Sequence, residues 1–573
     1  MPPVMSETEP HRQRARLLDL LLRTSRALGA EPDRPRLVEQ ILMEARALAG
    51  ADGGTLYLVD EHRSLRFAIM RNDTLKIHEG GTAPTPCRLT PVPLFHPDGR
   101  ENLDHLAARC YWKREAIAID DVANGSSELD TSKIRSFDET HNYVTRSFWS
   151  IPLLDSEGRV IGVIQLVNAR DPDTLEAVAF DAVHREMIEA LACLAAVALE
   201  NHGLLDAQRN LLESFIQVIA TAIDAKSPYT GAHCARVPVL TELLTNAACE
   251  AREGPFAEFQ LSEQERHEVR IAAWLHDCGK VSTPPHVMDK ATKLQTIFDR
   301  VELLATRFEL AATQARLDAH ERSRGDPDAL VTALREAQTV ERELRDALEF
   351  IRRVNLGAES LAREDRERLQ TLAARRIRAH DGTLRRLIEA DELENLLVER
   401  GTLTHRERLV INSHMVHTMD MLEALPFPPD LARVPEYAGG HHERMDGRGY
   451  PFGIHAGTMS IPARILAIAD VFEALTAADR PYKPAKPLSA TMAIMGAMKR
   501  DNHIDPDLFD LFVTSGAYRA FAREHLADEL QDEVDEQALL DIVPAPVSDH
   551  VLRRRETAEY LPEYRSFSVR RRS

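Results

Sequence analysis

Hydrophobic residues in the first third of the chain follow two different periods. Helical spacing covers residues 15–28 and 36–50, and the second segment ends at a glycine. Strand-type alternation then occupies five short segments, at 54–60, 64–70, 116–122, 148–155 and 160–169. The last two are joined by the tight turn DSEG, which predicts an antiparallel hairpin. Helices packed on a mostly antiparallel sheet predict an α+β domain at residues 17–201.

A long helix is predicted over residues 181–224, at the end of this domain. The apolar residues that recur every seven positions are Leu191, Ala198, Leu205, Leu212 and Ile219, with Met187, Leu194, Phe215 and Ala222 in the partner positions. Heptads over four repeats favour a parallel two-stranded coiled coil, so we expect a connecting signalling helix and a homodimer. The alternative is that each half of the stripe packs on the core of its own domain.

The rest of the chain is predicted to be helical. Residues 207–520 form an all-α domain with an insertion at 295–400, whose Arg, Glu, Ala and Leu content predicts long helices with a bend at SRGDPDA (323–329). The insertion is expected to mediate dimer contacts or bind a partner, without chemistry of its own. Residues 1–16 are expected to be disordered. Residues 521–573 form a helical and basic tail, and its final RSFSVRRRS is expected to be a disordered, solubilising end.

Composition restricts the class of protein. At 573 residues the chain is too long for one core and must be multidomain. Long uncharged apolar runs and a cleavable leader pattern are missing from the sequence, so we expect a cytoplasmic protein with no spanning helix and no membrane partner. The six cysteines lack paired spacing, as reduced thiols would. A formal net charge of −20 argues against a nucleic-acid polymer as partner but is compatible with a small anionic ligand held by a few local cations.

Metal-binding residue types occur in several places along the helical region, mostly on otherwise apolar segments. These five histidines and two aspartates are His233, His276, Asp277, His414, His441, His442 and Asp470. One such residue is usually a satisfied core group, but seven together indicate a metal site. Since successive helical residues point about 100° apart, His276 and Asp277 can address two metals from one turn, and Asp277 can bridge them. Paired cations suit the hydrolysis of a phosphoester.

The N-terminal domain resembles a GAF domain, a small-molecule sensor module. The resemblance rests on GTLYLVDE, on YVTRSFWSIPLLDSEGRVIGVIQLVNA and on the flanking helices, and it is closest to GAF domains of cyclic-nucleotide phosphodiesterases. Members that bind cyclic nucleotide carry Asn-Lys, then Phe, then Asp-Glu. Here Asn168 is followed by Ala169, and after Phe180 the Asp-Glu place holds His184 and Arg185, so the pattern is broken. Binding of an unknown small ligand and a structural role in dimerisation both remain open.

The helical region resembles an HD-GYP domain, the cyclic di-GMP phosphodiesterase branch of the HD hydrolases. The motifs that carry the resemblance are HDCGK (276–280), HHERMDGRGYP (441–451), ADVFEALT (469–476) and RPYK (480–483). The resemblance implies that the seven histidines and aspartates are ligands of two divalent transition metals, with iron and manganese favoured. A third metal in other members uses a glutamate four residues before the first histidine, where this chain has Tyr229.

The same resemblance implies roles for residues beside the metals. Asp277 and Lys280 would be the catalytic residues, with Lys280 contacting the scissile phosphate. Tyr450 would stack on or orient a guanine, while Arg480 and Lys483 would hold phosphates. The stretch before Arg480 is one residue longer than usual, which could turn both cations away from the substrate.

The loop around Tyr450 completes the expected site. Asp446 is counted among the substrate-binding residues because it shapes this loop together with Gly447. Gly449 is expected to supply a positive φ beside the tyrosine.

These features together predict a sensor-effector enzyme. The GAF domain would regulate a phosphodiesterase that converts cyclic di-GMP to linear pGpG, GMP or both. One alternative is hydrolysis of another cyclic dinucleotide or nucleotide. A second is a catalytically silent scaffold that binds cyclic di-GMP and transmits its occupancy.

Overall fold

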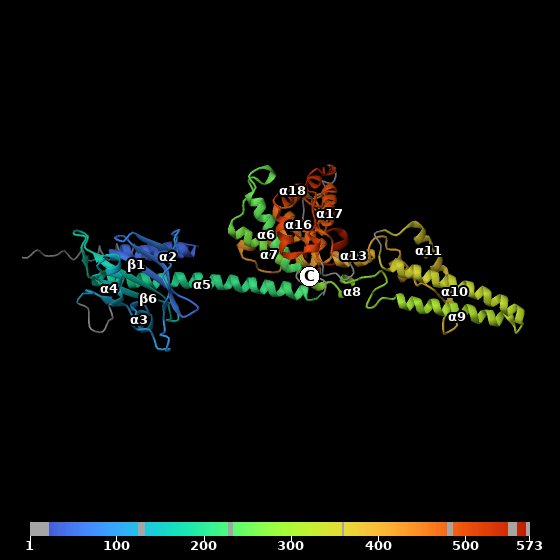
Figure 1. Ribbon diagram of the computed structural model, residues 1–573, viewed down its shortest axis with the longest axis horizontal. Helices are drawn as coiled ribbons and strands as arrows, with labels where there is room; N and C mark the ends of the chain where they lie inside the picture. The colour runs from blue at the N-terminus through green and yellow to red at the C-terminus, as the bar shows by residue number, and fades with distance from the viewer. Residues whose placement is uncertain are drawn as a thin grey trace, which may run out of the picture. The chain divides into compact units, whose positions relative to one another are not determined.

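The computed structural model describes residues 22–31, 33–123, 132–226, 233–357, 360–477, 485–547 and 559–568 (Figure 1). The chain divides into two compact units, residues 1–211 and 212–573. The first is an α+β unit and the second is largely helical, as predicted. The segment expected to be disordered, residues 1–16, lies outside the described residues.

An antiparallel sheet forms the centre of the first unit. Its strands are β1 (Ala51–Val59), β2 (Ser64–Asn72), β3 (Ile77–Gly80), β4 (Val92–Pro93), β5 (Ile117–Ile119), β6 (Phe148–Leu154), β7 (Val160–Arg170) and β8 (Ala177–Val178). The order is β3-β2-β1-β7-β6-β5, with β4 beside β2 and β8 beside β7. All five predicted strands are present, and β6 and β7 form the predicted hairpin, which turns at Gly158 with φ of 75°. The short strands β3, β4 and β8 were missed because they lack an alternating pattern.

Helices cover both faces of this sheet. The helices are α2 (Arg34–Ala49), α3 (Leu106–Lys113), α4 (Ser132–His141) and the start of α5 (Ala182–Asp224). Alternation along β1 divides its side chains: Leu56 and Leu58 join the core shared with α2 and α5, whereas Tyr57 joins the smaller cluster formed with α3. The larger cluster is the main hydrophobic core of the unit.

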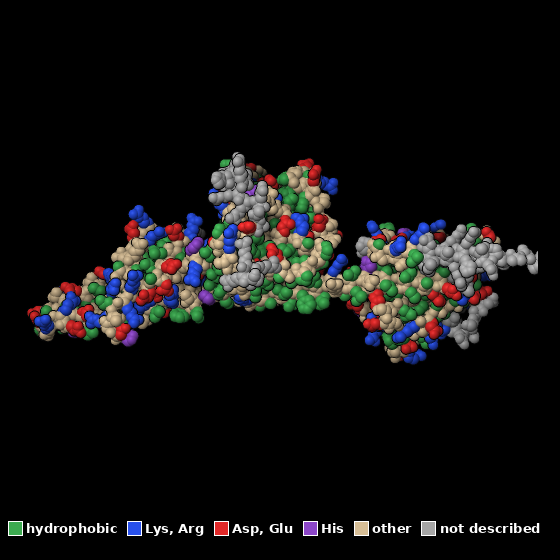
Figure 2. Space-filling view, turned by 180° about the vertical axis from the view of Figure 1, so that it is seen from behind, with side chains coloured by type: hydrophobic (Ala, Val, Ile, Leu, Met, Phe, Trp, Pro, Cys, Tyr) green, Lys and Arg blue, Asp and Glu red, His purple; other side chains and the backbone are tan. Residues whose placement is uncertain are grey.

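The long helix α5 changes its environment along its length. Leu191 and Ala198 are buried in the core of the first unit. Farther along, Leu205 and Phe215 are 54% and 58% exposed, while Ile216 is buried in the second unit. Figure 2 shows hydrophobic side chains along the border of the helical unit where α5 runs in Figure 1. The first half of the predicted heptad stripe therefore packs on its own domain, and the exposed second half is the part that a coiled coil could use.

The same helix meets a length and composition test for a membrane span over His184–Asp224. The sequence analysis expected no spanning helix. One such helix is weak evidence, since buried core helices pass the same test. The residues from Met187 to Leu199 that belong to the core of the first unit explain part of the high hydropathy.

The second unit is helical outside its insertion, as predicted. Its helices are α6 (His233–Glu250), α7 (Glu263–Leu275), α8 (Pro285–Met288), α13 (His405–Asn412), α14 (His414–Leu422), α15 (Val434–Gly439), α16 (Ile461–Thr476), α17 (Leu488–Arg500), α18 (Pro506–Thr514), α19 (Ala517–His525) and α20 (Glu536–Leu540). The main core joins α6 and α16 to α17, α18 and α19. Phe521 and Leu539 belong to this core, so the packed unit continues beyond residue 520.

The insertion has a core of its own. Helices α9 (Val301–Ser323) and α10 (Pro327–Asn355) lie side by side and form the predicted hairpin (Figure 1). Arg324 and Gly325 have positive φ at the bend, and Asp326 caps α10. Helices α11 (Arg363–Ala374) and α12 (Ala390–Leu396) complete it, with a small hairpin of β9 (Arg376–Arg378) and β10 (Leu384–Arg386) that the sequence analysis missed.

Two lysines fasten the base of the insertion to its surroundings. Lys290 is buried and its Nζ contacts Glu407 of α13 at 2.8 Å and Asn395 at 2.6 Å. Lys293 donates to the backbone oxygens of Leu396 and Val398 at 3.1 and 2.7 Å. Burial lowers the pKa of Lys293 to about 8. These polar contacts attach the base of the insertion to α13, the helix that precedes His414.

Candidate metal centre

The HDCGK motif lies where α7 ends. A capping box of Ser262 and Glu265 starts this helix, and it ends at Leu275, so His276 and Asp277 follow directly on its last turn. Both side chains are almost fully buried, at 0% and 1% exposure. The turn continues into a short 3-10 segment, Cys278–Ser282, that carries Lys280.

Gly279 in this motif is required by close packing. A Cβ at this position would lie 2.0 Å from the backbone oxygen of His414 and 2.4 Å from the backbone nitrogen of Thr418. Its own N–H donates to Thr418 Oγ1 at 2.9 Å. The glycine therefore lets α14 rest directly on the HDCGK turn, which brings His414 next to Asp277.

Backbone carbonyls orient three of the histidines. The Nδ1 atoms of His276, His414 and His441 lie 2.7, 2.6 and 2.6 Å from the carbonyl oxygens three residues earlier, as N–H donors would. This arrangement turns each Nε2 toward the centre. Short helices preceding His414 and His441 supply these carbonyls.

His233 is oriented by a carboxylate. It begins α6, and its Nδ1 contacts Glu473 of α16, which also accepts a 2.6 Å bond from Arg236. Asp470 lies one turn earlier on α16, so one helix supplies both a site carboxylate and the group that orients His233. The sequence analysis missed Glu473, although its position three residues after Asp470 on the same helix was a usable signal.

The structure brings together all seven residues predicted as ligands, in two groups that share Asp277. One group is His233, His276, Asp277 and Asp470; the other is Asp277, His414, His441 and His442. Candidate ligand atoms within each group lie within 4.8 Å of one another. Asp277 Oδ2 is 3.3 Å from His233 Nε2 and 3.2 Å from His276 Nε2, while its Oδ1 is 3.2 Å from His414 Nε2. Each carboxylate oxygen thus faces one group, as in a bridging ligand.

Several buried polar atoms at the centre lack a hydrogen-bond partner. Among the described residues these include Asp277 Oδ1 and the Nε2 atoms of His414 and His441, while Asp277 Oδ2 forms an ion pair with Lys280. Unsatisfied buried atoms of this kind are costly unless something binds them. Imidazole nitrogen and carboxylate oxygen are ligand types that first-row transition metals prefer. The residues present therefore fit a binuclear metal site.

The protonation states of His441, His442 and Asp277 agree with this assignment. Burial, reinforced by the nearby His276, lowers the pKa of His441 to about 4. Burial also holds the pKa of His442 well below its ordinary value, with His441 and His414 adding to the effect. For Asp277 burial favours the neutral form, but Lys280 and the surrounding histidines outweigh it and keep the pKa well below normal. The neutral imidazoles of His441 and His442 beside an ionised carboxylate are the forms that bind a metal. His233 differs: burial disfavours its charge, but Asp277, Asp470 and Glu473 outweigh burial and hold its pKa well above the ordinary value.

Lys280 lies at the edge of the centre. Its Nζ forms an ion pair with Asp277, and its side chain is 26% exposed. Burial disfavours its charge, but Asp277 and Asp470 raise its pKa above the usual value. A permanent cation here can meet an anionic substrate from the open side.

The loop after His442 places Tyr450 beside the second group. The rings of His442 and Tyr450 stack with centroids 4.8 Å apart and planes 22° apart. Glu443, which the sequence analysis missed, is buried and accepts the backbone N–H groups of Phe452, Gly453 and Ile454. The loop is therefore held by an internal carboxylate.

Asp446 and the two glycines near it help to shape this loop. Asp446 accepts bonds from Arg444 and from the Arg448 N–H at 2.9 and 3.0 Å, so it is engaged inside its own loop and belongs to neither ligand group. The prediction of a positive φ at Gly449 is wrong. The positive φ of this loop belongs to Gly447, at 71°. Gly449 is needed for space, because a Cβ there would lie 2.4 Å from Glu443 Cα.

Three residues of the sequence analysis lie outside the described residues. They are Tyr229, Arg480 and Lys483.

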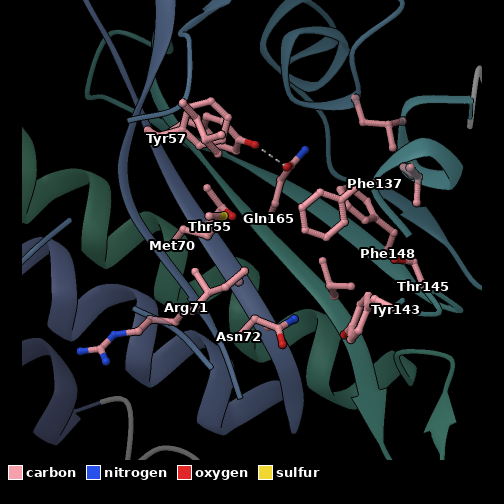
Figure 3. A pocket seen from close by; sticks show the side chains of 18 of the residues that line it. Thr55, Tyr57, Met70, Arg71, Asn72, Phe137, Tyr143, Thr145, Phe148 and Gln165 are labelled. Atoms are coloured by element: carbon pink, nitrogen blue, oxygen red, sulfur yellow. Dashed lines mark hydrogen bonds between the residues drawn. The ribbon is translucent and has the colours of Figure 1, made fainter. Parts of the chain in front are cut away.

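A separate cavity of 240 Å³ lies in the first unit (Figure 3). Aromatic and aliphatic side chains line it together with Tyr57 and Gln165. Tyr57 donates to Gln165 Oε1 at 2.9 Å, and Gln165 Nε2 donates to Ser150 at 3.0 Å. Tyr57 and Gln165, two of the polar side chains of this pocket, therefore have hydrogen-bond partners within the protein.

The broken Asn168 motif has a structural role in this unit. Asn168 Oδ1 accepts the backbone N–H groups of Arg146 and Ser147, and its Nδ2 donates to Tyr143 and Val144. Phe180 packs in the core. These bonds hold neighbouring segments together, so the Asn168 side chain is engaged within the protein.

Two protein-family models match this chain. The GAF domain model covers residues 33–199, and an HD domain model covers residues 390–508. The second match begins inside the insertion and does not reach His276 and Asp277.

Curated relatives match only part of the chain. A 3'3'-cGAMP-specific phosphodiesterase of Vibrio cholerae is 40% identical over 21% of this chain and 27% of its own length. A cyclic di-GMP phosphodiesterase of Pseudomonas aeruginosa is 38% identical over 21% and 27%. A cyclic di-GMP phosphodiesterase response regulator of Xanthomonas campestris is 36% identical over 22% and 32%. The chain thus spans about a quarter to a third of the length of these relatives.

Proposed function

We propose that this protein is a metal-dependent phosphodiesterase of cyclic dinucleotides. It carries a GAF domain followed by an HD domain related to the HD-GYP phosphodiesterases. The observation that carries the proposal is the pair of buried ligand groups that share Asp277. Cyclic di-GMP is the substrate we favour, with linear pGpG, GMP or both as products. The similarity to a 3'3'-cGAMP-specific enzyme makes that dinucleotide the second candidate.

Each part of the centre has a task in this reaction. The seven histidines and aspartates would hold two divalent transition metals, iron or manganese, which when bound would activate water and stabilise charge on a phosphodiester. Asp277 keeps the two groups together, and Glu473 fixes the ring of His233. Lys280 supplies a cation for a phosphate oxygen at the exposed edge. Tyr450, held by His442 and the Glu443 loop, orients a base.

We further propose that the first unit regulates this centre. The cavity between the sheet, α3, α4 and nearby loops offers room for a small ligand. The exposed apolar residues in the second half of α5 are suited to pairing with a second copy, which would make the enzyme a homodimer. Such a helix connects the sensor and the enzyme in one continuous element.

The proposal is tested by purifying the protein anaerobically and measuring bound metal and turnover in one sample. We expect about two metal ions per chain and conversion of cyclic di-GMP to a linear product, and chromatography measures this conversion. The parallel assay with 3'3'-cGAMP decides between the two substrates. Metal at that ratio with no turnover of either dinucleotide, even after ferrous or manganous supplementation, would favour a silent scaffold.

A further inference from the structure

The C-terminal segment 559–568 packs against the site that carries Tyr450. Its last residue, Ser568, is 4% exposed, so the expectation that RSFSVRRRS forms a disordered end is wrong for residues 565–568. Three contacts anchor the segment at separate points. Leu561 N–H donates to Pro451 O at 2.9 Å, the Tyr560 ring stacks on Phe452 at 5.2 Å, and Ser568 Oγ donates to Asp420 at 3.0 Å.

Tyr564 is the residue of this segment that reaches the site. It is 5% exposed, and its ring lies 5.9 Å from that of Tyr450, at 33°. Its hydroxyl accepts a 3.0 Å bond from Asn412 Nδ2. Tyr450 is therefore flanked by His442, on which it stacks, and by Tyr564.

These contacts join two stretches of chain that carry ligands of the same group. Asn412 ends α13 two residues before His414, and Tyr450 stacks on His442. Tyr564 thus contacts both stretches: its hydroxyl binds Asn412, close to His414, and its ring lies beside Tyr450, which stacks on His442. The remaining anchors lie on α14, which begins at His414, and on the loop after Tyr450.

We propose that Tyr564 is a positioning residue of the substrate site, which holds the Tyr450 ring where it receives a base of the cyclic dinucleotide. This inference rests on the proposed function and deepens it. A ring whose plane is already fixed loses less conformational freedom when a base stacks on it, so it binds and orients the base more effectively. The C-terminal segment would then be part of the enzyme and not an appendage.

The test compares a substrate that has bases with one that has none. Full-length protein loaded with metal is assayed with cyclic di-GMP and with bis(p-nitrophenyl) phosphate, an activated diester without a nucleobase. We expect Tyr564→Ala to raise KM for cyclic di-GMP about tenfold. Its kcat, its metal content and its rate on the activated diester should stay within about twofold of the wild type. Glu563→Gln, at the exposed neighbouring position, is the matched control and should change none of these.

A milder change guards against loss of folding, because Tyr564 is buried. Tyr564→Phe keeps the ring and removes only the bond from Asn412, so KM should rise about threefold. Asn412→Ala should have the same effect, and the double variant should add nothing to it.

Three results would overturn the inference. An unchanged KM in Tyr564→Phe and Tyr564→Ala would show that Tyr450 needs no support from the segment. Equal losses on both substrates together with loss of metal would show a general structural role. A wild type that cleaves the activated diester but no cyclic dinucleotide would instead refute the proposed function, and this inference with it.

Discussion

The metal centre and the cavity of the first unit both contain polar side chains, but they differ in how those groups are satisfied. At the centre, Asp277 Oδ1 and the Nε2 atoms of His414 and His441 are buried atoms that no hydrogen bond satisfies in the described structure. In the cavity, Tyr57 and Gln165 bond to each other. Unsatisfied atoms of defined type identify the chemistry of what binds, whereas a closed network does not. The comparison explains why a metal can be inferred for one site while the ligand of the other has no chemical signature.

The largest effect is expected from Asp277→Asn, which removes the group shared by both halves of the centre. Turnover should fall by about a thousandfold or more, since an amide cannot bridge two cations as a carboxylate does. Metal analysis and chromatography of the reaction measure this. Asp505→Asn is the matched control: its carboxylate is buried at 5% exposure, caps α18 and accepts a bond from Arg464, tasks that the side-chain oxygen of asparagine also performs. Near-normal turnover in Asp277→Asn would mean that the two groups do not act together.

A smaller loss is expected from Glu473→Gln. This variant keeps all seven ligands but weakens the orientation of His233, so metal affinity should fall about 10- to 100-fold. Competition with a coloured chelator measures it. Glu436→Gln, in a surface ion pair with Arg433, should leave the affinity unchanged. Equal affinities in both variants would assign Glu473 a purely structural task.

Removal of metal should distinguish the two units. Chelation should lower the unfolding temperature of the helical unit by about 5 °C or more, because a ligand of the native state stabilises it by mass action. The unfolding of the first unit should not change. Differential scanning calorimetry with and without chelator resolves the two transitions. A shift in the unfolding temperature of the first unit alone would contradict a metal site in the helical unit.

The smallest effect on activity is expected in the cavity. Tyr57→Phe leaves Gln165 Oε1 without its donor, so the first unit should lose about 1–3 kcal/mol of unfolding free energy, measured with urea. The double variant Tyr57→Phe, Gln165→Leu removes both partners and should recover part of that loss. Turnover without added ligand should stay close to that of the wild type. A gain in stability on Tyr57→Phe would mean that the tyrosine hydroxyl is not satisfied as described.

Much of the fold followed from local patterns in the sequence. Alternation gave the five main strands, and the bend at Gly325 was marked by SRGDPDA. The little hairpin at 376–386 was missed because its Arg-rich strands have no apolar face to recognise. Heptad spacing in α5 was real but ambiguous, since a buried half and an exposed half carry the same pattern.

The candidate site was predictable to the extent that its residues sit in compact motifs. Five of the seven ligand positions lie in such motifs, whereas His233 and His414 were identified as single metal-binding residue types elsewhere in the helical region. The structure gathers all seven into two groups. Glu473 and Glu443 were missed because they act through other residues, by orienting a ring and by holding a loop. Gly449 was assigned the wrong reason, since a sequence does not show whether a glycine supplies a positive φ or makes room for a neighbour. Tyr564 was out of reach because its contact with Tyr450 spans more than a hundred residues.

The most direct test of the account is anomalous X-ray diffraction from crystals of the anaerobically purified protein, recorded at the iron and manganese absorption edges. The account predicts two anomalous peaks, one on each side of the Asp277 carboxylate, with the histidines of each group around its own peak. A single peak, or none with Asp277 paired only to Lys280, would contradict the shared binuclear centre on which the proposed function depends.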